Sequence, residues 1–147
     1  MNKKIIIIPI FVIVIISGLF IIKFSEKESD VTTGLFFLSM TNSDYYSDGI
    51  YMIQEYTEEG EYSFRFTPSG SSPKILSITL SGENFDFHED FKLKSIAHDA
   101  WNGEKYYTWE YVGKKTILIS EEQEVTITVD PNGSVNGEYS VGLMKNK

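Results

Sequence analysis

The 147-residue chain contains no cysteine. That absence excludes disulfides, thiolate nucleophiles, iron–sulfur clusters and zinc or copper sites built on cysteine. Basic residues are also few, because 13 Lys and Arg stand against 21 Asp and Glu, which gives a formal net charge of −8. Neutralising nucleic-acid phosphates requires clustered Lys and Arg, so we expect no nucleic-acid partner.

Motifs that carry catalysis are missing as well. The sequence has no Gly-x-Ser-x-Gly elbow, no phosphate-binding glycine loop and no His-Glu-x-x-His helix motif. The carboxylate pairs Glu58/Glu59 and Glu121/Glu122 are adjacent residues, which point to opposite faces of a strand or lie in a turn. We therefore expect that the chain is not an enzyme and holds no catalytic cofactor.

The amino terminus carries the longest apolar run. Lys3 and Lys4 make residues 1–4 positively charged, and the following 18 residues, 5–22, are uncharged. As a helix this run spans about 27 Å, close to the hydrocarbon thickness of a bilayer. A cleaved secretory peptide is the alternative, but its apolar region is normally shorter and ends in small residues. A pilin-type segment would need a small residue before Ile5, where Lys4 stands. The pattern favours a retained transmembrane signal anchor.

The charges beside this run predict the orientation. Lys3 and Lys4 precede it without an acidic neighbour, whereas residues 23–33 mix both signs. The positive-inside rule then places the amino end in the cytoplasm. We expect a single-pass protein of the cell membrane, with a polar tether over residues 23–33 and an extracytoplasmic domain over residues 34–147.

Beyond residue 49 the hydrophobic pattern alternates with a period of two, which is typical of half-buried antiparallel strands. Residues 34–40 are an apolar run that we interpret as a first buried strand, with the end of a stalk as the alternative. Residues 94–101 are expected to form a short turn of helix. Glycines recur at intervals that fit strands joined by turns. Taken together, the sequence predicts an all-β fold, a single antiparallel β-sandwich of about eight strands. Alternation marks strands at Tyr62–Phe66, Leu76–Leu80, Phe85–Phe87, Tyr107–Tyr111, Val125–Val129 and Tyr139–Leu143.

One segment resembles a known family. Residues 60–66, Gly-Glu-Tyr-Ser-Phe-Arg-Phe, followed after a Ser/Gly-rich turn by residues 74–78, are similar to the Gly-x-Tyr-x-Phe-x-Phe hairpin of GOLD-type sandwiches. Those are lumenal domains of p24 cargo proteins and related interaction modules. The resemblance implies a jelly-roll or GOLD-like sandwich that binds a partner. The carboxy-terminal anchor, coiled coil and cysteine pair of p24 proteins have no counterpart here.

Residues 84–90 form the densest polar group. On a strand, Asn84, Asp86 and His88 project from one face, and the neighbouring Glu89 and Asp90 add charge. Asp86, His88 and Asp90 are the candidate ligands, and His98 and Asp99 are expected to approach from the next loop. Oxygen ligands with one imidazole suit a divalent metal, which is the one cofactor this sequence suggests. The alternative is a solvated face of the sheet that binds nothing.

A second candidate site is aromatic. Exposed Trp101 and Tyr106 would stack against sugar rings and make the domain a glycan-binding module. Tyr107, Trp109 and Tyr111 alternate on the same segment, and we interpret them as the core face of one strand.

The sequence contains one candidate glycosylation site. Asn132-Gly133-Ser134 matches the N-glycosylation pattern and falls in a predicted exterior turn, so a glycosylating host would have access to Asn132.

We expect the chain to act as a membrane-anchored, non-catalytic binding or assembly module with a protein partner outside the cell. Divalent-metal binding and glycan binding are the alternatives.

Overall fold

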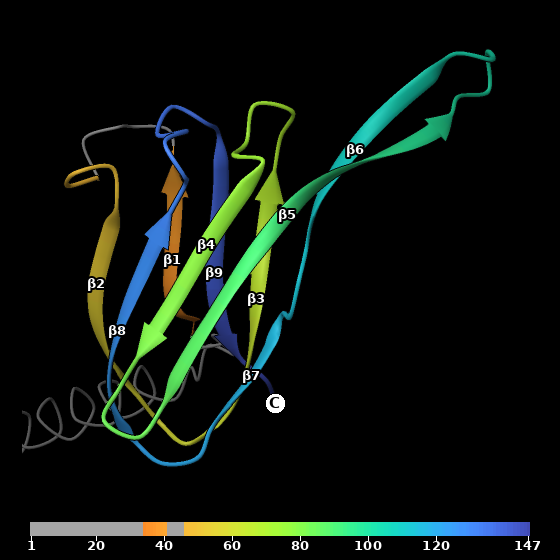
Figure 1. Ribbon diagram of the computed structural model, residues 1–147. Coiled ribbons are helices and arrows are strands. Elements are labelled where there is room, and N and C mark those ends of the chain that lie inside the picture. Colours follow the sequence, from red (N-terminus) through yellow and green to blue (C-terminus); the bar gives the residue numbers. More distant parts are fainter. Residues whose placement is uncertain (1–33, 41–45) are drawn as a thin grey trace, which may run out of the picture. The chain divides into compact units, whose positions relative to one another are not determined.

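The computed structural model describes residues 34–40 and 46–147, and this part of the chain is built from β-strands alone (Figure 1). The predicted all-β class is therefore confirmed for these residues. The predicted cytoplasmic end (1–4), transmembrane anchor (5–22) and tether (23–33) lie outside them. Within residues 34–40 and 46–147 the structure contains no helix that would cross a bilayer.

The strands form two antiparallel sheets. One has four strands in the order β1-β9-β3-β7, and the other has five in the order β2-β8-β4-β5-β6. The first strand predicted from the apolar run at residues 34–40 is present as β1, paired with β9. The strands are β1 (Gly34–Met40), β2 (Tyr51–Thr57), β3 (Gly60–Pro68), β4 (Ile75–Ser81), β5 (Asp86–Asp99), β6 (Lys105–Val112), β7 (Thr116–Ile119), β8 (Gln123–Asp130) and β9 (Tyr139–Lys145).

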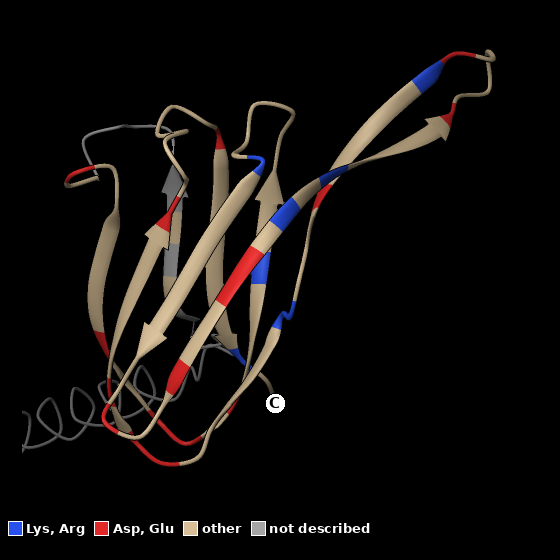
Figure 2. Cartoon of the chain, viewed as in Figure 1, with Lys and Arg blue, Asp and Glu red and all other residues tan. Residues whose placement is uncertain are grey.

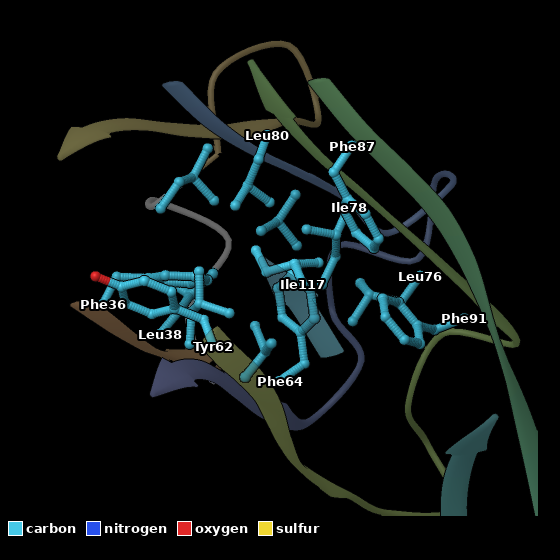
Figure 3. Packing of buried hydrophobic residues seen from close by; sticks show 14 of the residues in the cluster. Phe36, Leu38, Tyr62, Phe64, Leu76, Ile78, Leu80, Phe87, Phe91 and Ile117 are labelled. Carbon is cyan, nitrogen blue, oxygen red and sulfur yellow. The ribbon is translucent and has the colours of Figure 1, made fainter. Parts of the chain in front are cut away.

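A single hydrophobic core receives side chains from both sheets, so the fold is sandwich-like (Figure 3). On β8, Val125, Ile127 and Val129 are fully buried, and the two residues between them are half-buried. This is the period of two that the sequence predicted, and it arises because successive side chains on a strand point to opposite faces. Phe64 of β3 meets Phe91 of β5 in an edge contact 5.4 Å between ring centres.

The longest strand extends past the sandwich. Strand β5 covers 14 residues, and its pairing with β4 ends where Lys92 lies opposite Ile75. From there to Asp99, β5 pairs with β6 alone. The resulting two-stranded arm, residues 93–111, extends away from the two sheets (Figure 1). The helical turn predicted for residues 94–101 is therefore wrong, because cross-strand pairing with β6 holds this segment extended up to Asp99.

The strand pair suggested by the family resemblance is not a hairpin. Strand β3 pairs with β7 and β9, whereas β4 pairs with β5 and β8 in the other sheet. The Ser/Gly-rich segment between them crosses from one sheet to the other. Local alternation identified both strands correctly, but it contains no information about which strand each one pairs with.

Candidate functional site

The three predicted metal ligands lie on the outer face of β5. Each carries a contact to a neighbour: Ser81 donates to Asp86 at 2.8 Å and Ser77 donates to Asp90 at 2.6 Å. His88 Nδ1 lies 2.9 Å from the Thr79 hydroxyl, and its Nε2 lies 3.4 Å from an Asp90 carboxylate oxygen. These residues form a polar ladder across β4 and β5 (Figure 2 colours the acidic positions of β5 red).

The second pair of metal candidates does not approach this ladder. His98 and Asp99 lie on the same strand as His88, ten and eleven residues further along, or about 33 Å at the rise of an extended strand. His98 instead stacks on Tyr106, with ring centres 4.9 Å apart, and its Nε2 lies 2.8 Å from the Thr108 hydroxyl. In residues 34–40 and 46–147, no three His, Asp or Glu side chains are grouped so that they would hold a metal ion.

The aromatic candidates lie on the arm. Trp101 is 99% exposed at its tip, and Tyr106 is 54% exposed on β6. Both rings are therefore accessible, and glycan binding by this pair stays a prediction. Tyr106 and its stacking partner His98 lie directly opposite each other on the arm's outer face.

Only part of the predicted aromatic core face is buried. Tyr111 is fully buried, but Trp109 is 37% and Tyr107 is 57% exposed. The three residues do share one face, as alternation required, but β6 reaches the sandwich only at Tyr111, so Tyr107 and Trp109 lie on the arm. The sequence cannot show where a strand loses the opposite sheet that would cover it.

A cleft of about 680 Å³ opens where the arm leaves the sandwich. Its walls come from segment 70–75 between β3 and β4, from the turn at 131–134 between β8 and β9, and from the base of the arm. The arm contributes Leu93, Ser95 and Trp109. A volume of this size is typical of small-molecule sites.

Hydrogen bonds fix the walls of this cleft. The Ser72 hydroxyl donates to the Glu138 carbonyl oxygen at 2.6 Å and accepts from the Ser69 backbone N–H at 2.7 Å. On the opposite wall, the Asn132 amide nitrogen donates to the Ile75 carbonyl oxygen at 3.2 Å and to the Ser77 hydroxyl at 3.0 Å. The Ser-rich segment is therefore held in one conformation before any ligand arrives.

Asn132 lies in an exposed turn, as its sequon predicted, and adopts a positive φ of 51°. Its side-chain nitrogen, the atom that glycosylation would modify, is also the donor in the two bonds to Ile75 and Ser77. Modification of Asn132 stays a prediction, and it would leave only one hydrogen for these bonds.

Trp109 forms one side of the cleft because Gly70 leaves room for it. A methyl group built at Gly70 would lie 3.3 Å from three atoms of the indole ring, including Nε1. The ring also borders a smaller hollow of about 190 Å³ against Arg65 and Phe66 of β3. The indole ring of Trp109 therefore separates the larger cleft from the smaller hollow.

Charge at the cleft differs from that of the whole chain. Among the described residues that line the larger cleft, only Lys74 is ionised at neutral pH. Strand β5 and the arm carry residues of both signs, and further acidic residues lie in the loops at the opposite end of the sheets (Figure 2). Those loops connect β2 to β3, β4 to β5 and β7 to β8.

Comparisons of this chain with protein-family models, with curated proteins and with solved structures found no match. Two aromatic residues of the arm were predicted from the sequence, but the cleft was not. The one local signal of the cleft is the Ser-Gly-Ser-Ser run at residues 69–72, which was predicted only as a turn.

Proposed function

We propose that this chain is a single-pass membrane protein whose extracytoplasmic β-sandwich acts as a non-catalytic binding module. The apolar run at residues 5–22 supports the anchor, and the acidic composition supports an exterior domain that avoids anionic lipid surfaces. The ligand or partner binds at the hairpin arm and the cleft at its base.

The arm is the observation that carries this proposal. An isolated two-stranded hairpin is only marginally stable in water, and this one exposes several large apolar and aromatic side chains. Exposed apolar patches of this kind commonly mark interaction sites. On the arm these residues are Ile96, Trp101, Tyr106, Tyr107 and Trp109.

We also propose that the sandwich is a jelly roll to which the arm has been added. Without β6, the sheet orders β1-β9-β3-β7 and β2-β8-β4-β5 are those of two interleaved Greek keys, as in eight-stranded jelly rolls. The predicted number of about eight strands fits this frame. Strand β6 is then an extra strand, which supports a role for the arm in binding rather than in forming the frame.

Binding is favoured over catalysis by the residues at the cleft. The described side chains that line it include hydroxyls, an amide and one ammonium group, but no carboxylate and no imidazole. General acid–base chemistry usually depends on those two groups.

Cysteine accessibility tests the topology, since the natural chain has none. We expect Gly103→Cys, at the arm tip, to react with a membrane-impermeant maleimide in intact cells. Asn2→Cys serves as the matched control and should react only after permeabilisation. Labelling of Asn2→Cys in intact cells, or recovery of a shortened chain free in the medium, would contradict the proposal.

A further inference from the structure

We propose that the cleft and the inner face of the arm bind an acidic polysaccharide. Its sugar rings stack on Trp109 and Tyr107, and one of its carboxylates pairs with Lys74. This inference rests on the proposed exterior binding module, and it replaces Trp101 and Tyr106 as the stacking residues.

The register of the arm creates the stacking surface. Trp109 lies opposite Ser95, and Tyr107 lies opposite Ala97 on the same face of the hairpin. Each ring therefore stands beside a small side chain that leaves space above it. Two residues apart on a strand, the rings are about 7 Å from each other along the arm. A row of two rings leading out of a cleft suits a linear ligand with repeating flat apolar faces.

The polar groups around Trp109 are available to ligand hydroxyls. Within the described part of the chain, no hydrogen bond is formed by the Trp109 indole N–H or by the hydroxyls of Ser95 and Ser134. Indole N–H groups and a few well-placed polar side chains in an otherwise apolar cleft are what orient polar ligands. The hydroxyl of Ser72, in contrast, is already occupied within its own segment.

The charge distribution favours an acidic glycan over a neutral one. The Lys74 ammonium forms no ion pair within the described residues, and it is the only ionised group that they contribute to the cleft lining. A uronic-acid carboxylate that enters the cleft therefore meets one ammonium group without an ion pair and no carboxylate among the lining residues.

A proline-rich peptide is the principal competing ligand, since such peptides dock on aromatic grooves. Its backbone offers no carboxylate to Lys74 and no hydroxyls to the serines. The experiment therefore includes both types of ligand.

The chain has two tryptophans, so replacing one of them lets fluorescence report on the other alone. In the full-length chain in detergent micelles, Trp101→Phe leaves Trp109 as the only indole. We expect oligogalacturonate, a uronic-acid oligomer, to change its emission in a saturable way in monovalent salt. A galactose oligomer of equal length should bind roughly two- to fivefold more weakly, the contribution of an exposed ion pair. The converse variant, Trp109→Phe, should show no change of emission.

Neighbouring residues give the matched controls. Tyr107→Ala should weaken binding by roughly two- to tenfold, the range for an aromatic contact. Tyr106→Ala removes an equally exposed ring from the opposite face and should leave binding unchanged. Lys74→Gln should weaken oligogalacturonate binding about threefold without affecting the galactose oligomer.

Three outcomes would overturn the inference: no emission change with either oligosaccharide, an equal loss in Tyr106→Ala, or a response to a polyproline peptide alone. Failure here is separable from failure of the proposed function. Exterior labelling of Gly103→Cys together with no sugar binding would remove only the glycan, because the micelle assay does not depend on topology.

Discussion

The Tyr111 hydroxyl donates a hydrogen bond to the Pro73 carbonyl oxygen, 2.8 Å away, across 38 residues of sequence. Tyr111 is fully buried at the base of the arm, and Pro73 lies in the segment that forms one wall of the cleft. This bond therefore joins the arm to the cleft wall.

Replacing Tyr111 with Phe should destabilise the fold. The change leaves a carbonyl oxygen without its partner in a buried place, which costs about 1–3 kcal/mol. Urea unfolding followed by circular dichroism measures this loss. Tyr107→Phe, on the same strand but exposed, is the control and should change the free energy of unfolding by less than about 0.5 kcal/mol. Equal stability of the two variants would mean that the Tyr111 bond contributes nothing.

Alkaline pH should unfold the domain through its buried tyrosines. Burial raises the pKa of Tyr111 and of Tyr139 above the usual value of about 10. The unfolded chain therefore releases these protons first, so stability is fully present below pH 10 and is lost as pH rises. Each group contributes a slope of about 1.4 kcal/mol per pH unit above that point.

Urea unfolding between pH 9 and pH 11.5 tests this dependence. Tyr139→Phe removes one of the two groups, so its stability should fall about 1.4 kcal/mol per pH unit less steeply than that of the unaltered chain. The variant also loses the 2.8 Å contact between the hydroxyls of Tyr46 and Tyr139, which lowers stability at neutral pH. Identical slopes for the two proteins would refute the assignment of the raised pKa.

Gly137 should tolerate no side chain. A methyl group there would lie 2.8 Å from the Pro73 ring and 2.9 Å from the Ser71 carbonyl oxygen, which is backbone and cannot easily move. We expect Gly137→Ala to cost about 1–3 kcal/mol, the usual effect of overpacking. Thermal unfolding measures it. Gly133→Asn is the control, because that turn is open and Asn accepts positive φ. A neutral Gly137→Ala would show that the two loops are not packed as described.

The outer arm should be dispensable for folding. Replacing residues 97–107 with Asn-Gly joins Ile96 through a two-residue turn to Thr108, which already lies opposite it. These residues lie outside the hydrophobic core, so stability should change by less than about 1 kcal/mol. Ile127→Ala, inside the core, should cost about 2–5 kcal/mol in the same unfolding assay. A comparable loss of stability on shortening the arm would show that the arm contributes to the stability of the sandwich.

Sequence periodicity predicted much of this fold because burial on one face imposes it. The alternation over Val125–Val129 and over Leu76–Leu80 corresponds to buried residues of β8 and β4. Which strands pair with each other could not be predicted from this alternation, as the resemblance over residues 60–78 shows. Two alternating strands with a turn between them are equally consistent with a hairpin and with a crossing between sheets.

The candidate site was harder to predict for a related reason. Tyr107, Trp109 and Tyr111 have identical spacing and similar chemistry, yet only Tyr111 is covered. Coverage comes from the opposite sheet, where Phe66 of β3 packs against Tyr111 with ring centres 5.2 Å apart, and β3 is more than 30 residues away in the sequence. The cleft likewise forms where three segments that are distant in the sequence come together, and no local sequence pattern predicts that contact.

The continuity of β6 with β7 has a mechanical consequence. The chain runs from β6, in the five-stranded sheet, into β7, in the four-stranded sheet. Between these strands, the Lys115 carbonyl oxygen accepts a 2.8 Å hydrogen bond from the Phe64 N–H of β3. Strands β6 and β7 are both edge strands, so tension applied at the arm tip would pass from the edge of one sheet to the edge of the other and reach both layers.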